Sequence, residues 1–472
     1  MKLSSSGRLI LLGCGAVSRC LQALLLQNDE LKPSQIVLVD ACLQDPKRNP
    51  LIEAGAPFHH FRLSPDNYKT FLQTIVKPGD MVVNLLAGVD SADILEWCHD
   101  TNVIYVDTSV ELWRKENCEL SDPLHDTMFM RYTRLYERFA HWRDGAPTAI
   151  LEHGANPGLV SHWLKHGLEY LASEFSDSDI ETALRAKDYA RVAMLTGTKV
   201  VHVSEYDRQV SSTKRNPTVF VNTWSAEGLR EESNAFTECS WGTHERSLPP
   251  EALQLSHDRL FHLCIKRKGI NFPVRSWVPN EEMTGMMIPH GETFTMGNRL
   301  SLWENGKLLY RPTVCFIYRP SLPALQSLYA FADNTINVAK DHLMTTEISE
   351  GSDDLGVLLM GTYGAVWVGN RLSIKRTRDI VGPQYNATVL QVASSVLSAM
   401  TWALDNPHRG LLLPGDLPFQ SILPVAHKYI GELEIHRTNW KPSPEHGNHF
   451  EWQFQDFSVS HKGKSAQLLL ST

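Results

Sequence analysis

The sequence predicts an α/β fold: a Rossmann-type domain with a parallel sheet, then a second α+β domain with a mixed, largely antiparallel sheet. Three observations lead to this prediction. The chain of 472 residues is too long for one hydrophobic core. Apolar runs alternate with helical patterns over the first 150 residues, as crossover connections between parallel strands require. Beyond residue 150 strand-like runs dominate, and turn sequences such as Asn305-Gly306 separate some of them.

The first predicted strand, GRLILLGCG (7–15), runs directly into a glycine turn, and a helical pattern follows in AVSRCLQALLLQN (16–28). Gly13, Gly15 and Ser18 occupy the positions of the three glycines in a dinucleotide-binding fingerprint. Gly13 permits the tight turn, Gly15 lets a pyrophosphate approach the backbone, and Ser18 is small enough for close packing. The motif therefore predicts a nucleotide cofactor, against the alternative of a Rossmann-like domain that binds none.

The second predicted strand, 34–40, ends on Asp40, whose carboxylate would accept hydrogen bonds from ribose hydroxyls and repel a 2′-phosphate. This favours NAD over NADP. Two further strands, 78–87 and 102–109, lead into polar residues at the edge where such sheets bind ligands. We expect the following side chains to point toward the cofactor or substrate: Asn84, Asp90, Asp107, Thr108, Ser109 and Glu111. Asp90 is equally well placed to cap the helix that follows it.

The segment LEHGANPGLVSHWLKHGLEYLA (151–172) opens from a glycine- and proline-containing loop into a helix. With LLGCG and VDTSVE upstream, it resembles the bacterial homospermidine synthases of the saccharopine dehydrogenase-like group. The likeness extends over nearly the whole chain, through the pieces VSEYD, NTWSAEGLREE, IPHGE, SDDLGVLL and YNATVLQVASSVLSAM. The resemblance implies an NAD-dependent aminoalkyl transferase. Such an enzyme makes homospermidine from two putrescines, or from spermidine and putrescine, through an imine and without net redox change.

The resemblance also implies the residues of the substrate site. They are the tryptophan and acidic residue Trp224 and Glu232, the further acidic ligands Glu205, Glu111 and Asp90, the pocket residues His290 and Asp354, and Asn156 near the nicotinamide. Asp353 stands beside Asp354 and could take its place. Carboxylates bind ammonium groups, and an indole face stabilises a transient iminium without attacking it. Glu205, Glu232 and His290 are the candidates for the base that deprotonates the substrate.

Composition and charge exclude several classes of protein. The net charge is −8 and no basic stretch could follow a phosphate backbone, which argues against nucleic-acid binding. We expect no membrane span, because no apolar run is long enough to cross a bilayer, and the eight scattered cysteines suit reduced thiols in the cytoplasm. His162 and His166 share one helix face, but no third ligand accompanies them, so we expect no metal. We expect a homodimer.

We predict domain boundaries at 1–150 for the dinucleotide-binding domain and 151–382 for the substrate domain. Residues 383–415 are predicted to return to the first domain as a helix, and 416–472 to form a surface extension. A turn is predicted around 369–374. Two alternative functions stay open: a saccharopine or carboxyspermidine dehydrogenase-like NAD(P)-dependent reductase, and a non-catalytic protein that keeps the fold.

Overall fold

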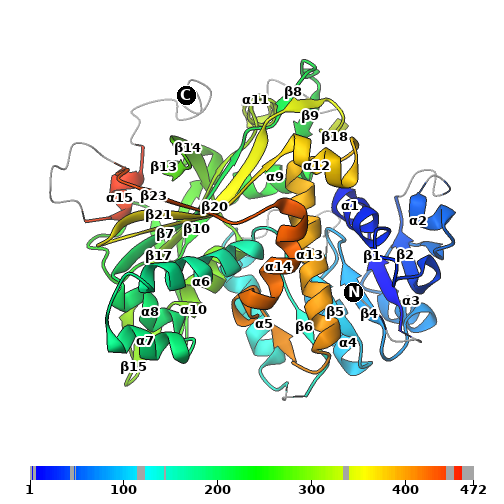
Figure 1. Ribbon diagram of the computed structural model, residues 1–472, viewed down its shortest axis with the longest axis horizontal. Helices are drawn as coiled ribbons and strands as arrows, with labels where there is room; N and C mark the ends of the chain where they lie inside the picture. The colour runs from blue at the N-terminus through cyan, green and yellow to red at the C-terminus, as the bar shows by residue number, and fades with distance from the viewer. Residues whose placement is uncertain are drawn as a thin grey trace.

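The computed structural model describes residue 3 and residues 7–42, 47, 49–113, 123–142, 145–332, 340–442 and 451–459. Two large sheets lie side by side, and the long helix α13 (Ala387–Asp405) stands between them (Figure 1). One sheet is parallel, and the other is mixed and mostly antiparallel. The predicted fold class is therefore confirmed.

The first sheet has seven parallel strands in the order β22-β6-β5-β4-β1-β2-β3. Its strands are β1 (Leu9–Leu12), β2 (Ile36–Asp40), β3 (Phe58–His60), β4 (Met81–Asn84), β5 (Ile104–Asp107), β6 (Ala149–Ile150) and β22 (Leu411–Leu412). Its helices are α1 (Ala16–Leu25), α2 (Pro50–Glu53), α3 (Tyr68–Ile75), α4 (Ser91–Asp100) and α5 (Met128–Phe139). The strand order reverses between β1 and β4, which is where a doubly wound sheet binds its ligand.

Different helices cover the two faces of this sheet. Neighbouring residues of a strand point to opposite faces, so each strand contributes side chains to both clusters. Leu9 and Leu11 of β1 join the core cluster that contains α1 and α13. Ile10 and Leu12 join the cluster that contains α3, α4 and α5. All four side chains are fully buried, which is why the sequence of β1 is continuously apolar rather than alternating.

The second sheet has the order β13-β14-β17-β7-β20-β21-β23, and only the β17–β7 pairing is parallel among the strands described. Its strands are β7 (Thr198–Asp207), β13 (Pro273–Val278), β14 (Glu281–Ile288), β17 (Thr313–Arg319), β20 (Ser352–Gly361), β21 (Gly364–Ser373) and β23 (Glu434–Thr438). Besides α13, the helices after β6 are α6 (Leu159–Ala172), α7 (Ser178–Arg185), α8 (Tyr189–Leu195), α9 (Ala226–Asn234), α10 (Gly291–Arg299), α11 (Leu322–Ala332), α12 (Ile374–Val381), α14 (Phe419–Ile430) and α15 (Phe454–Phe457).

Smaller sheets complete the second domain. A three-stranded sheet contains β10 (Phe236–Cys239), β12 (Leu260–Lys268) and β11 (Ala252–His257). The two-stranded sheets are β15 (Leu302–Glu304) with β16 (Lys307–Tyr310), β9 (Val219–Asn222) with β18 (Lys340–Leu343), and β8 (Val210–Ser211) with β19 (Ile348–Glu350). The predicted Asn305-Gly306 turn joins β15 to β16, and both residues have positive φ angles, as such a hairpin requires.

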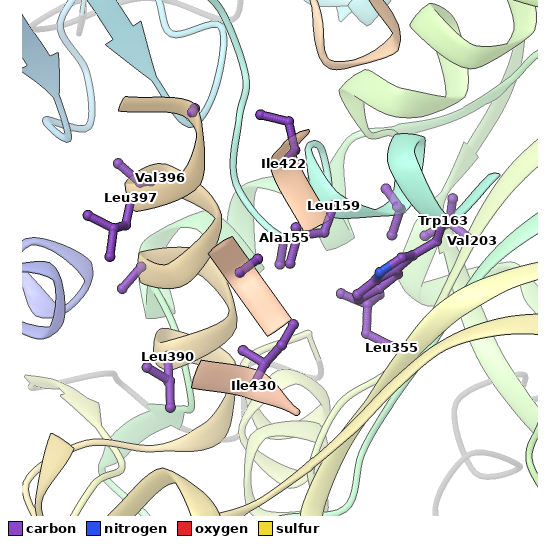
Figure 2. Packing of buried hydrophobic residues seen from close by; sticks show 14 of the residues in the cluster. Ala155, Leu159, Trp163, Val203, Leu355, Leu390, Val396, Leu397, Ile422 and Ile430 are labelled. Atoms are coloured by element: carbon purple, nitrogen blue, oxygen red, sulfur yellow. The ribbon is translucent and has the colours of Figure 1, made fainter. Parts of the chain in front are cut away.

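A shared hydrophobic cluster connects the two domains. Figure 2 shows Leu390, Val396 and Leu397 on α13, with Ile422 and Ile430 on α14 nearby and Trp163 of α6 among residues of the second sheet. Helix α13 also packs on α1 and β5. By length and composition α13 could cross a bilayer, but most of it is buried within the protein.

The structure differs from the sequence predictions in two places. Residues 416–472 are not simply a surface extension, because α14 packs on α13 and β23 pairs with β21 at the edge of the second sheet; residues 443–450 and 460–472 lie outside the described part. The turn predicted around 369–374 is wrong. Gly369 lies within β21 and pairs with Gly356 of β20, and a Cβ on Gly369 would lie 2.5 Å from the Cα of Gly356.

Candidate active site

A cavity of about 580 Å³ lies at the ligand-binding edge of the first sheet and extends to the second domain. Both the glycine-turn side (Val17, Leu85) and the second sheet (Glu205, Tyr318) contribute to its walls. Of the residues predicted from the sequence, it is lined by Thr108, Ser109, Glu111, Asn156, Glu205, Trp224, Glu232 and His290. The structure thus brings these eight residues together, while their individual roles stay predictions.

The glycine turn forms the nucleotide side of the site. Gly13 has a φ of +97°, and a Cβ there would lie 2.8 Å from the carbonyl oxygen of Leu85, so this position requires glycine. A Cβ at Gly15 would meet nothing within 4 Å, and no side chain caps α1 at this residue. The first turn of α1 thus lacks a side-chain cap and has free space beside Gly15, as a bound pyrophosphate requires. Ser18 is buried within α1 and accepts a hydrogen bond from Gln22.

Asp40 ends β2 beside this turn. Its carboxylate accepts hydrogen bonds from the backbone N–H of Cys14 (2.7 Å) and of Cys42 (2.5 Å), which fixes its position against the turn. The side chain is buried to 8% exposure. A fixed anion at the end of the second strand is the arrangement that recognises ribose hydroxyls and disfavours a 2′-phosphate.

Glu205 lies on β7, the central strand of the second sheet, and is 4% exposed. Its Oε2 accepts a hydrogen bond of 2.9 Å from Nδ2 of Asn156. Burial is the largest influence and raises the pKa of Glu205 to about 8; the hydrogen bond from Asn156 opposes this, and nearby Asp207 adds to it. A cation in the cavity would favour the ionised form of this carboxylate.

Aromatic rings form one wall of the cavity. Trp224 precedes α9, and its Nε1–H donates to the hydroxyl of Tyr318 at 3.0 Å. Tyr318 stacks with Phe316, the ring centroids being 5.8 Å apart, and Phe316 in turn lies 4.7 Å from the ring of His290. Trp224 and Tyr318 lie beside Glu205, so an electron-rich face and a carboxylate are presented together to a ligand.

His290 lies between two carboxylates. Its Nδ1 is 2.5 Å from Oε2 of Glu292, and its Nε2 is 3.9 Å from Oε1 of Glu232. Burial by itself would lower the pKa of His290, but the two carboxylates outweigh it and raise this pKa to about 9. Burial also raises the pKa of Glu232 to about 7, which the charge of His290 partly counteracts.

Glu111 closes the cavity on the side of the first sheet. Its two carboxylate oxygens accept hydrogen bonds from the backbone N–H of Gly88 (3.1 Å) and from the hydroxyl of Ser109 (3.0 Å). Because Thr108 and Ser109 follow β5 directly, the carboxyl end of that strand places these polar groups at the ligand edge.

Three predicted site residues do not line this cavity in the structure, and their side chains have other partners. Asp90 caps α4, where its carboxylate accepts from the N–H groups of Ala92 and Asp93. Asp354 pairs with Arg208 at 3.0 Å. Asn84 is buried beneath the turn, where it donates to the hydroxyl of Tyr105.

The residue beside Asp354 is placed differently. Asp353 is fully buried, accepts a hydrogen bond from the hydroxyl of Thr388, and has no partner for its Oδ1. Thr388 itself lines the cavity. Asp353 therefore lies behind the cavity wall, close enough to Glu205 for the charge of Glu205 to raise its pKa. Its place in the substrate site stays a prediction.

Sequence reasoning missed several lining residues. Tyr318, Phe316 and Arg131 reach the cavity, and Glu292 and Glu152 lie behind His290. Phe316 and Tyr318 are two residues apart and therefore lie on the same face of a strand. Many buried strands show the same spacing, so it does not identify a site. No local pattern distinguishes Glu292 or Glu152 from ordinary acidic residues.

The whole chain is similar to known families of dehydrogenases and synthases. The saccharopine dehydrogenase NADP binding domain matches residues 9–150, and the saccharopine dehydrogenase C-terminal domain matches residues 154–438. The curated homospermidine synthase of Blastochloris viridis is 33% identical over 445 residues, which cover 92% of both chains. That of Mesorhizobium japonicum is 30% identical over 473 residues, covering 96% of both.

Solved structures give the same relationship. The homospermidine synthase of Legionella pneumophila, solved in complex with NAD, has a TM-score of 0.86 and 31% identity, and the match covers 97% of this chain and 99% of that one. A saccharopine dehydrogenase of Saccharomyces cerevisiae has a TM-score of 0.51 at 12% identity, with 92% and 100% coverage. This second likeness reflects the fold alone.

Proposed function

The chain belongs to the homospermidine synthase family, and from this premise we propose that it makes homospermidine from two putrescines, or from spermidine and putrescine. The charge of the cavity carries the proposal. Its described lining includes the carboxylates Glu111, Asp126, Glu205, Glu227, Glu231 and Glu232, whereas Arg131 is its only lysine or arginine. Arg131 is paired with Glu231 at 3.4 Å. A slender dication fits this lining, whereas the carboxylate substrate of a saccharopine dehydrogenase-like reductase does not.

NAD is the proposed cofactor, and the residues of the glycine turn fit it. When bound, NAD would take a hydride from the carbon next to the substrate nitrogen and later return it, so that no net redox change occurs. The backbone at Gly15 leaves room for the pyrophosphate, and α1 offers its N-terminal N–H groups. The matching family model is described as NADP binding, but the buried carboxylate of Asp40 supports NAD.

Replacing Asp40 with asparagine is expected to weaken NAD binding about 10- to 100-fold, since a hydrogen bond to a charged group contributes about 1.5–3 kcal/mol. The amide oxygen can still accept from Cys14 N–H, so the turn should survive. Discrimination against NADP should fall at the same time. Titration of both cofactors by nicotinamide fluorescence measures this, with the exposed Asp29→Asn as control. An unchanged ratio of the two affinities would contradict the assignment.

The carboxylates of the cavity would bind the two ammonium groups of the substrate. One ammonium must lose a proton before its carbon can give up hydride, and this requires an acceptor within hydrogen-bond reach. Glu205 and Glu232 suit that task because their pKa values, about 8 and about 7, lie near neutral pH. After oxidation, the face of Trp224 would stabilise the cationic carbon–nitrogen bond without reacting with it.

We also propose that the protein works as a homodimer in the cytoplasm. The seven cysteines within the described residues are unpaired, which fits a reducing compartment. Light scattering of the purified protein would determine the number of subunits.

The proposed reaction can be tested with purified protein, putrescine and NAD. We expect homospermidine and ammonia in equal amounts, with no accumulation of reduced nicotinamide at its absorbance band. A reductase would instead consume reduced cofactor in proportion to product. Absence of homospermidine, both from putrescine alone and from spermidine with putrescine, would refute the proposal.

A further inference from the structure

Behind His290, on the side away from the cavity, lie two carboxyl groups that the proposed amine site does not use. Glu292 belongs to the first turn of α10, and Glu152 follows β6; both are 0% exposed. Oε2 of Glu292 contacts Nδ1 of His290 at 2.5 Å. Glu152 lies against the start of α10, because a Cβ on Gly291 would be 2.3 Å from its Oε2.

These two carboxyl groups are short of hydrogen-bond partners. Both oxygens of Glu152 and Oε1 of Glu292 lie buried without a partner at good hydrogen-bond geometry. Two donors act on the pair, the hydroxyl of Thr295 on Glu152 and Nδ1 of His290 on Glu292. After burial, the charge of Glu292 is the strongest influence that raises the pKa of Glu152. Two adjacent buried carboxylates with so few donors cannot both be ionised, so the pair must retain a proton.

We propose that Glu152 and Glu292 share one proton and act as positioning residues that hold His290 as an imidazolium whose Nε2–H serves the cavity. Glu152 carries the proton and Glu292 the negative charge. This inference rests on the proposed function, in which a leaving amine needs a proton donor. It adds two residues that are not in contact with the cavity to the machinery of the reaction.

The imidazolium would act when the carbon–nitrogen bond to the leaving amine breaks. The bonding electron pair goes to nitrogen, and Nε2 of His290 gives that nitrogen its proton. The imidazole left behind keeps its Nδ1–H on Glu292 and regains a proton at Nε2 from the next ammonium that binds. No proton is gained or lost overall, which matches a transfer that begins and ends with amines.

The charged groups around His290 come from several elements. Glu292 lies on α10 and Glu232 on α9, and both raise the pKa of His290; Glu152, after β6, would add to them only when it is ionised. Glu205 on β7 is influenced by both Glu292 and Glu232. Phe316 on β17 contributes an apolar ring. A bound substrate cation would lower the pKa of His290 by charge repulsion. The inference is therefore tested on the protein without substrate.

Nuclear magnetic resonance titration of histidine-labelled free protein tests this inference, with the His290 signal identified by its loss in His290→Asn. In the wild type His290 should stay protonated above pH 7. Glu292→Gln should lower its pKa by about one to three pH units. Glu152→Gln, which replaces a neutral acid with a neutral amide, should leave that pKa nearly unchanged.

The inference is overturned if wild-type His290 titrates at or below about 6.5, the ordinary value. It is also overturned if Glu292→Gln leaves the pKa in place, or if Glu152→Gln lowers it equally. The wild-type titration decides the matter even where a variant fails to fold. Because neither substrate nor cofactor is present, a failure here is distinct from a failure to make homospermidine.

Discussion

Trp224→Ala should lower kcat/KM for putrescine by about 30-fold or more, while NAD affinity stays within about twofold. A desolvated cation on an indole face gains about 2 kcal/mol or more, and about 1.4 kcal/mol corresponds to a tenfold change in rate. The variant also removes the hydrogen bond from Trp224 to the hydroxyl of Tyr318. Steady-state kinetics and a cofactor titration measure the two quantities separately.

Two controls make the Trp224 prediction specific. Trp224→Phe keeps an aromatic face but loses the Nε1–H, so its kcat/KM should fall between the wild type and the alanine variant. Trp440 lies outside the cavity and donates to Glu282, so Trp440→Ala should leave kcat/KM within about twofold. If Trp224→Ala retains full kcat/KM, or loses NAD binding and activity together, the amine-pocket role of Trp224 is wrong.

Glu205→Gln should weaken putrescine binding about 10- to 100-fold, since a charge-assisted hydrogen bond is replaced by a neutral one. In the wild type, putrescine binding should also be linked to the ionisation of Glu205. At pH 7 Glu205 is mostly protonated, because burial raises its pKa to about 8. An arriving ammonium favours the carboxylate, so binding should release a proton, and affinity should rise with pH up to about 8.

Calorimetry at pH 7 in buffers of different ionisation enthalpy measures this proton release. The release should be present in the wild type and absent from Glu205→Gln; the exposed Glu281→Gln serves as control. The same pKa has a consequence for stability. Relative to Glu205→Gln, the wild-type free energy of unfolding should fall as the pH rises from about 4.5 to about 8, because the folded state favours the protonated acid. Proton release that is equal in both proteins would contradict the role of Glu205.

Local sequence signals were enough to predict the first domain. The turn at Gly13 and the carboxylate of Asp40 lie within one βαβ unit, where spacing along the chain determines spacing in the fold. Asp90 shows the limit of such signals, because an acid after a strand serves equally as a helix cap, and here it caps α4. Gly369 was misread for a similar reason: glycine permits a turn, but here it permits two strands to approach closely.

The substrate half of the site could not be derived from local patterns. Trp224 and Glu232 were identified through family resemblance, since one tryptophan among twelve carries no signal of its own. Glu152 and Glu292 were missed because their relation depends on a contact between segments far apart in the chain. The edge strand β23 was missed because its sequence, EIHRT, is polar and only half-buried.

A crystal structure of the protein with NAD and putrescine tests the central claim most directly. The account predicts one ammonium nitrogen within about 3 Å of Glu205 and the diamine chain lying along the face of Trp224. A diamine bound away from both residues, with the acidic cavity left to solvent, would contradict it.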